Sequence, residues 1–364
     1  MTWISCDEAK PICSNCNRLE LECIYDRVPQ SPNSNKSSPT SSTDKSTVVL
    51  PESESRRRLE LRLFYQYITD TGPSLALDDI SAHFWVKTLC RLALESDALL
   101  YSMYMIAALH TEQRSNFTDM EADATCQTYV NMAIHEHHKE VAEISAQNVE
   151  YICLTSSMLR VHSFVQLQGR SLQPYTAPID WLRISNTSKI LFRSAWDLVK
   201  DKPESVAHEM VKSVSTWLID RENEELRQDL KHLLRREEPH ELEEPWDSET
   251  EEVYATTLNL IGGIWRAMKD KQCPATSIGR RVVIFPMMLR KQFADFVEEL
   301  RPRALVILAH YFALLSMLGK FWWVGDSGFR EIQAISQILP EHWQRLLDWP
   351  KKILQEKDVT YTLG

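Results

Sequence analysis

The sequence predicts an all-α protein in which a small cysteine-rich module and a Ser-rich segment precede one large helical region. Only 9 of the 364 residues are glycine, which favours helices over turn-rich β architecture. Hydrophobic residues make up 43% of the chain and charged residues 25%, a balance typical of a globular protein. From about Leu59 onward, apolar residues recur at helical spacing, and almost no segment alternates with the period of a β-strand.

The first half of the helical region consists of patterns that follow one another with short breaks. Residues 97–114 carry apolar side chains at helical spacing, among them Leu99, Met103 and Ile106. Pro203, Pro239 and Pro245 mark breaks in the series, because proline interrupts a helix. The pattern predicts helices over residues 84–94, 97–114, 120–144, 149–167, 179–199, 206–218 and 224–234.

The second half begins with an acidic stretch, residues 237–252, which we expect to be a solvated loop. Pro302 supports a helix start, because proline is favoured at the first helical position. Residues 304–318 are apolar but shorter than the roughly 20 residues that span a bilayer, so they predict a core helix and no membrane span. The pattern after the acidic stretch predicts helices over residues 253–268, 286–300, 302–318, 329–339 and 340–352.

Four cysteines near the N-terminus form the strongest chemical signal in the chain. Cys6, Cys13, Cys16 and Cys23 are spaced C-x6-C-x2-C-x6-C, with Lys10-Pro11 between the first two. A two-residue step lets both sulfurs turn toward one ion, so the spacing suits a tetrahedral zinc site. The sequence therefore predicts zinc as the cofactor and these cysteines as its ligands.

The same segment resembles the Zn₂Cys₆ domain of fungal transcription factors, whose pattern is C-x2-C-x6-C-x6-C-x2-C-x6-C. The resemblance implies that Cys6 is the third ligand, Cys13 the fourth and bridging one, and Cys16 and Cys23 the fifth and sixth. Residues 1–5 stand where that family has its first C-x2-C repeat and basic run. Two explanations stay open: an incomplete gene model or splice form, or a single zinc ion for which Cys6 leaves its family geometry.

The charge of this segment weighs against strong DNA binding, although the resemblance implies DNA as the partner. The whole chain carries a net charge of −10. Phosphate contacts need cations, and residues 1–27 have a balance of −2. The charged residues of the segment are Lys10, Arg18 and Arg27 against Asp7, Glu8, Glu20, Glu22 and Asp26. Because the basic first repeat is absent, the DNA-contacting residues stay unknown.

Composition changes abruptly after residue 27. Residues 28–55 are rich in Ser, Thr, Pro and Asn, and such a stretch has too little apolar surface to offset the entropy of ordering. We expect a disordered, flexible linker there. The predicted organisation is a partial Zn₂Cys₆ domain over 1–27, a linker over 28–55 and an all-α regulatory domain over 56–364.

The helical region, about residues 59–352, resembles the sterol uptake control class of fungal regulators. Residues 302–315 carry the resemblance, together with Phe321-Trp322-Trp323-Val324, Trp343 and Asp348-Trp349-Pro350. The resemblance implies a helical regulatory domain that in part of the class responds to a sterol. Trp322, Trp323, Phe329 and Trp343 are then candidates for the wall of a site for a sterol or another apolar small ligand. Aromatic residues at helical spacing also suit ordinary core packing.

The remaining clusters do not indicate catalysis. The run from His135 to His138 has Lys139 where a His-Glu-x-x-His zinc protease motif needs its second histidine, so a partly exposed polar face is expected. Cys90, Cys126, Cys153 and Cys273 are scattered through helical patterns and are expected to be ordinary buried thiols. The chain is therefore not predicted to be an enzyme.

The sequence thus predicts a zinc-cluster transcription factor that regulates RNA polymerase II transcription through a helical, sterol-responsive domain. We expect a homodimer and a nuclear location, with shuttling from the cytoplasm. The alternative is a helical ligand-binding or dimerisation module that has lost DNA binding. The acidic N-terminal segment favours this alternative.

Overall fold

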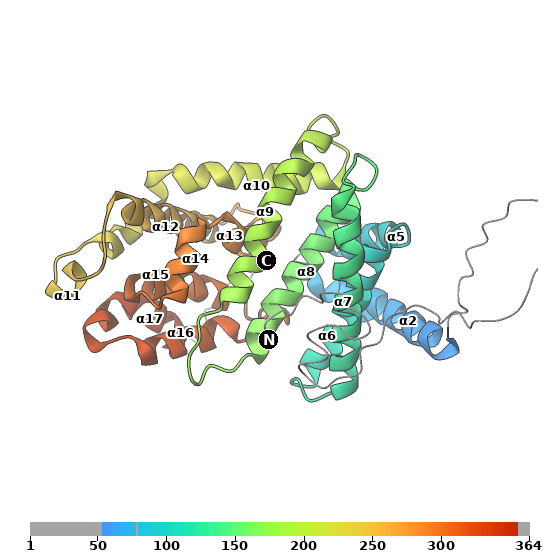
Figure 1. Ribbon diagram of the computed structural model, residues 1–364, viewed down its shortest axis with the longest axis horizontal. Helices are drawn as coiled ribbons and strands as arrows, with labels where there is room; N and C mark the ends of the chain where they lie inside the picture. The colour runs from blue at the N-terminus through green and yellow to red at the C-terminus, as the bar shows by residue number, and fades with distance from the viewer. Residues whose placement is uncertain (1–52, 78, 356–364) are drawn as a thin grey trace, which may run out of the picture. The chain divides into compact units, whose positions relative to one another are not determined.

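The computed structural model describes residues 53–77 and 79–355, and within these ranges every regular element is a helix (Figure 1). The all-α prediction is confirmed. The described residues all belong to one compact unit. The predicted module over 1–27 lies outside the described residues, as does the predicted linker up to residue 52. Nothing in the described helices is long and apolar enough to cross a membrane.

The helices follow one another with short connections. Their first half comprises α2 (Glu54–Gln66), η1 (Tyr67–Thr71), α3 (Gly72–Leu75), α4 (Asp79–His83), η2 (Phe84–Thr88), α5 (Leu89–Ala93), α6 (Asp97–Arg114), α7 (Met120–Ala142), α8 (Val149–Gly169) and α9 (Ile179–Val199). Their second half comprises α10 (Val206–Glu222), η3 (Glu224–Leu234), α11 (Pro239–Leu242), α12 (Ser248–Lys269), α13 (Ala275–Met288), α14 (Lys291–Glu298), α15 (Pro302–Ser316), α16 (Ser327–Ile338), η4 (Glu341–Leu347) and α17 (Asp348–Gln355). The elements η1 and η2 are π-helical, whereas η3 and η4 are 3₁₀ helices.

Side-chain caps explain why several helices begin where they do. Ser53 accepts the Arg56 N–H at 3.2 Å and starts α2. Asp119 caps α7 through the N–H groups of residues 121 and 122. Asp247 accepts the Thr250 N–H at 2.7 Å, so α12 begins at Ser248, inside the predicted acidic loop. Each of these oxygens satisfies an N–H group that has no partner within the helix.

The predicted helix over residues 286–300 is wrong, and the reason lies around Pro286. The sequence predicted a helix start at residue 286, but Pro286 lies inside α13, and α14 is a separate helix. Proline has no N–H to donate to the carbonyl four residues earlier, which here is Val282 O. The Tyr311 hydroxyl of α15 donates to that carbonyl at 3.0 Å, so the proline leaves no unpaired acceptor.

The centre of the fold is α15, which is buried on all sides. Every residue from Arg303 to Leu315 is buried, as expected for a helix that is apolar all round and lies inside a domain. It contacts α12, α14, α16, η4 and α17. A second set of contacts joins α6 to α7 and α8, and α9 contacts both α8 and α13 (Figure 1).

Candidate functional site

The four predicted zinc ligands, Cys6, Cys13, Cys16 and Cys23, lie outside the described residues. Their chemistry alone therefore decides what they can hold. Four thiolates complete the coordination of one tetrahedral zinc ion. A binuclear cluster needs six, so this donor set fits one ion and does not by itself fit two.

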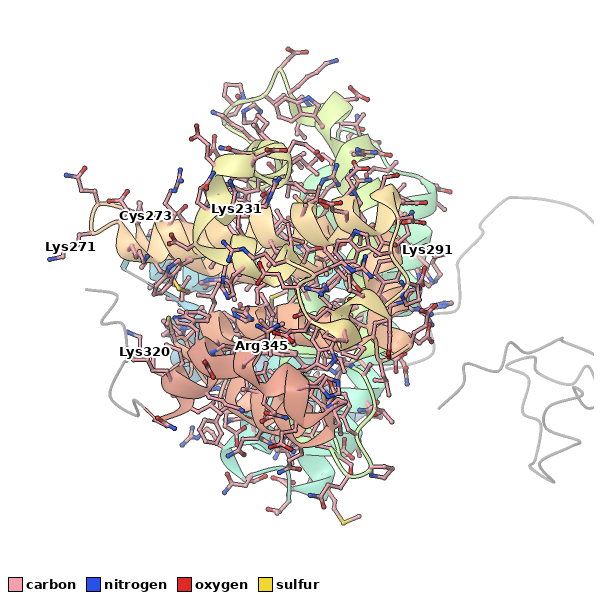
Figure 2. All side chains as sticks on the ribbon, turned by 90° about the vertical axis from the view of Figure 1, so that its left-hand side faces the viewer. Lys231, Lys271, Cys273, Lys291, Lys320 and Arg345 are labelled. Carbon is pink, nitrogen blue, oxygen red and sulfur yellow. The ribbon has the colours of Figure 1, made fainter. Side chains whose placement is uncertain are left out.

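The other four cysteines lie in the helical region, where the first three are buried thiols as predicted. Cys90, Cys126 and Cys153 are buried in α5, α7 and α8, and burial raises the pKa of the Cys90 thiol to about 11. A thiol kept protonated is a poor metal ligand, since zinc binds the thiolate. Cys273, labelled in Figure 2, is half-buried. Within the described ranges, no group of three or more His, Cys, Asp or Glu side chains is placed to hold a metal ion.

The histidine run on α7 is only partly as predicted. His135 and His138 are exposed, in agreement with a polar surface. His137 is buried instead, and its Nε2 is hydrogen-bonded to the Ser156 hydroxyl of α8 at 3.0 Å. Burial first, and then the charges of His138 and Arg160, lower the pKa of His137 to about 4. The imidazole is therefore neutral at physiological pH.

Two of the predicted ligand-wall residues lie against α6 and α8. The Trp322 ring stacks on His110 with 4.5 Å between ring centroids, and its carbonyl accepts from the Gln168 amide at 2.8 Å. Trp323 is buried and meets the edge of Phe164 at 6.2 Å. Trp322 keeps partial exposure, whereas Trp323 has the surroundings of a core residue.

The other two predicted residues have different neighbours. Trp343 is buried, and the Arg303 guanidinium lies 5.2 Å from its ring centroid, a cation–π contact. Phe329 is half-buried on α16. The described contacts thus place Trp343 against α15 and the pair Trp322 and Trp323 against α6 and α8. The role of the four residues in binding a ligand stays a prediction.

A small cavity lies elsewhere, between α10, α12 and α13. Its volume of about 20 Å³ is room for a single water molecule. Asp220 and Arg281 form an ion pair at its edge, and the Arg281 guanidinium also lies 5.5 Å from the Trp217 ring centroid. The lining residues are Trp217, Asp220, Leu260, Ile264, Arg281, Phe285 and Met288. None of the predicted ligand-wall residues is among them.

The acidic stretch, residues 237–252, is only in part the solvated loop that we expected, because most of its residues are exposed but α11 and the start of α12 lie within it. Glu241 and Glu244 are buried. Glu244 accepts from Arg303 Nε and from the Tyr254 hydroxyl, each at 2.8 Å, and Arg345 (Figure 2) donates to Glu241 at 2.7 Å. These carboxylates attach the segment to α12, α15 and η4, because their partners Tyr254, Arg303 and Arg345 lie on those helices.

Sequence reasoning did not single out the buried arginines. Arg303 is fully buried, with its Nη1 donating to the backbone carbonyls of Leu233 and Arg235. Arg160 is 2% exposed on α8. Arg303 lies within the apolar run 302–315, where a lone charged residue has no solvated face to occupy. Arg160 lies between Leu159 and Val161 in the mostly buried α8. For Arg303, the position within an apolar run was the available signal.

Comparison with known proteins confirms the resemblance to fungal Zn₂Cys₆ transcription factors, whereas the resemblance to the sterol uptake control class stays a prediction. Residues 3–32 match the model of the fungal Zn(2)-Cys(6) binuclear cluster domain, a family that binds zinc. The chain is 26% identical over 318 residues to the Zn(2)-C6 fungal-type transcription factor afumD of Aspergillus fumigatus, covering 85% of this chain and 81% of the relative. It is 23% identical over 346 residues to a Zn(2)-C6 fungal-type transcription factor of Gibberella zeae, covering 88% of this chain and 66% of the relative.

These matches identify the chain as similar to fungal zinc-cluster transcription factors. The alignment with afumD covers 318 residues, whereas only 52 residues precede the helical region. Most of the aligned residues therefore lie in the helical region. Zinc is confirmed as the cofactor of this type of domain. Proteins of the class are generally not enzymes.

Proposed function

We propose that this protein is a nuclear transcription regulator in which a zinc-bound N-terminal module is joined to an all-α regulatory domain. The match of residues 3–32 to the zinc-cluster domain carries the proposal. Two regulators with similarity across most of the chain, and a helical region with its own core, support it. The finer parts of the proposal are the zinc ligands, the DNA affinity, the apolar ligand and the dimer.

For the metal, we propose one zinc ion held by Cys6, Cys13, Cys16 and Cys23. The purified full chain should then contain about one zinc per molecule by elemental analysis, because four thiolates complete a single tetrahedral site. Cys16→Ser should lose that zinc, whereas Cys273→Ser, which changes a half-buried thiol of the helical region, should retain it. Two ions per chain would show that another residue supplies the missing bridge.

For DNA, we propose that the chain with this sequence binds weakly. Affinity for duplex DNA depends on cations that neutralise phosphates, and residues 1–27 have a charge balance of −2. A mobility-shift assay at moderate salt should show no sequence-selective complex. Sequence-selective binding at nanomolar protein concentration would contradict this expectation and would show that this chain recognises DNA.

The alternative function, a ligand-binding or dimerisation module, is favoured by that same acidic balance. For a sterol ligand we retain Trp322, Trp323, Phe329 and Trp343 as the proposed wall; the partial exposure of Trp322 and Phe329 supports it. Ergosterol should raise the melting temperature of the protein, and Trp322→Ala should reduce the rise more than Trp196→Ala, a half-buried tryptophan of α9. Equal rises would remove these residues from the site.

We also propose that the protein is a homodimer and moves between cytoplasm and nucleus. Light scattering during gel filtration should give twice the 42.3 kDa mass of one chain. A single-chain mass at every concentration would contradict the dimer. Fluorescence microscopy of the tagged protein tests the movement, and a signal confined to the nucleus under all conditions would contradict it.

A further inference from the structure

Arg160, in the middle of α8, is a buried cation without a carboxylate partner among the described residues. Its Nη2 donates to the Ser157 hydroxyl at 2.9 Å, and its Nη1 contacts the Met287 sulfur of α13 at 3.9 Å. The guanidinium lies 5.0 Å from the centroid of the Phe192 ring of α9. Its Nε has no partner in the part of the chain that the structure describes. A hydroxyl, a thioether and an aromatic face are weak compensation for a buried charge.

Two other buried or half-buried arginines of this protein show the usual solution. Arg303 is paired with Glu244 at 2.8 Å, and Arg170 donates to the buried Glu331 at 2.8 Å. At Arg160 the ionisable neighbour that acts on the pKa is the Cys153 thiol, and no described carboxylate does so. Burial lowers the pKa of Arg160 to about 10, in keeping with a charge that lacks compensation. No described carboxylate forms an ion pair with Arg160.

The surroundings of Arg160 are rich in hydrogen-bond donors. On the same side of α8, the Ser156 hydroxyl is hydrogen-bonded to His137, whose Nδ1 has no partner among the described residues. Ser157 is only half-buried, so the cluster reaches toward solvent at that side chain. Figure 1 shows α9 running between α8 and α13, the helices that carry Arg160 and Met287. At this place a guanidinium and a hydroxyl lie beside the apolar side chains of Phe192 and Met287.

We propose that Arg160, with Ser157, binds the carboxylate of a small organic acid with an apolar body. The carboxylate is favoured because it carries one negative charge, which balances one guanidinium, and because its two oxygens match the planar fork of arginine. A phosphate would add a second charge for which the cluster has no second cation among the described residues. Phe192 and Met287 would contact the apolar body. This effector site goes beyond the proposed transcriptional role and does not depend on DNA or zinc binding.

The test is thermal melting of the full chain with probes that differ only in charge. Benzoate and octanoate, each titrated to its solubility limit, should raise the melting temperature by several degrees, because a ligand that binds only the folded state stabilises it. Benzamide and octanol, their neutral counterparts, should not. The rise with the acids should vanish in Arg160→Met and persist in Arg183→Met, which removes an exposed arginine paired with Glu298.

The melting temperature without ligand gives a second, independent readout. Replacing an uncompensated buried charge by an apolar side chain of similar length should leave the melting temperature of Arg160→Met equal to or above that of the wild type. A structural arginine would behave in the opposite way. The proposal is overturned if neither acid shifts the wild type, if the neutral probes shift it equally, or if Arg160→Met melts well below the wild type.

Discussion

At the scale of single residues, the buried pair of Arg303 and Glu244 shows how charge is used inside this fold. Arg303 lies in the first turn of α15 and is fully buried, yet its guanidinium contacts a carboxylate, two backbone carbonyls and the rings of Trp246 and Trp343. Glu244 in turn accepts from the Tyr254 hydroxyl. The two charges therefore connect the segment before α12 to the centre of the domain.

Arg303→Met should destabilise the protein by about 3–5 kcal/mol, because it leaves the Glu244 carboxylate buried without a counter-charge. Urea denaturation followed by circular dichroism measures the change in the free energy of unfolding. Adding Glu244→Gln to the same chain should recover part of the loss, since the amide needs no counter-charge. Arg183→Met, at a half-exposed ion pair, should change the free energy by less than about 1 kcal/mol.

Three buried histidines predict how stability changes with pH. Burial is the main cause that lowers the pKa values of His110, His137 and His310 to about 4. In the unfolded chain a histidine has a pKa near 6.5. The unfolded state therefore binds protons first, so the stabilisation is complete above pH 6.5 and is lost as the pH falls toward 4.

The measurement is the melting temperature between pH 7 and pH 4.5, where each such histidine costs up to about 1.4 kcal/mol per pH unit. His137→Gln should reduce this pH dependence, because glutamine does not titrate and can still bond to the Ser156 hydroxyl. His135→Gln, two residues away on the exposed face of α7, is the matched control and should leave the dependence unchanged. Identical pH profiles for both variants would contradict the role of burial.

At the scale of elements, the contact between α12 and η3 depends on a close approach of two backbones. A Cβ atom added at Gly262 would lie 1.9 Å from the carbonyl oxygen of Leu226, so only glycine fits. One residue further along α12, a Cβ at Gly263 would meet nothing closer than 3.4 Å. Packing against η3 thus requires glycine at position 262, whereas position 263 has room for a larger residue.

Gly262→Ala should destabilise the protein by at least about 1–3 kcal/mol, because η3 must move away from α12. Gly263→Ala should be neutral or stabilise by up to about 1 kcal/mol, since alanine is the better helix former. Chemical denaturation of the two variants measures the difference. A loss of the same size in both would show that flexibility of α12, and not the approach of Leu226, requires the glycines.

The same scale shows what the sequence could and could not predict of the fold. Residues 97–114 and 179–199 were predicted with the bounds of α6 and α9, because the helical spacing of apolar residues is a local signal. The boundary at Pro286 was wrong, because the hydroxyl that fills the Val282 carbonyl comes from Tyr311, in another helix. The burial of Glu244 within the acidic stretch was not predicted for the same reason, since its partner Arg303 is 59 residues away in the chain.

At the scale of the whole molecule, the zinc site could be predicted from the sequence, whereas a ligand site in the helical region could not. The proposed zinc ligands, Cys6 to Cys23, follow from spacing along the chain, and the family match covers the residues that contain them. A ligand site is made of residues distant in sequence. Trp343 and Trp322 looked equivalent as aromatic residues, but one packs on Arg303 and the other stacks on His110. Arg160 became a candidate only through its contacts with Ser157, Phe192 and Met287, which lie on three different helices.

The helical region should fold without zinc and without the N-terminal segment. Its buried core runs from Leu63 to Leu347, and Ser53 caps the first helix, so the described residues contain the apolar surface and the cap that a domain needs. A shortened chain beginning at Ser53 should give a helical circular dichroism spectrum with cooperative melting. Chelation of zinc from the full chain should leave the melting temperature of the helical signal unchanged. Loss of cooperative melting in either experiment would mean that the helices depend on the metal-bound segment for their stability.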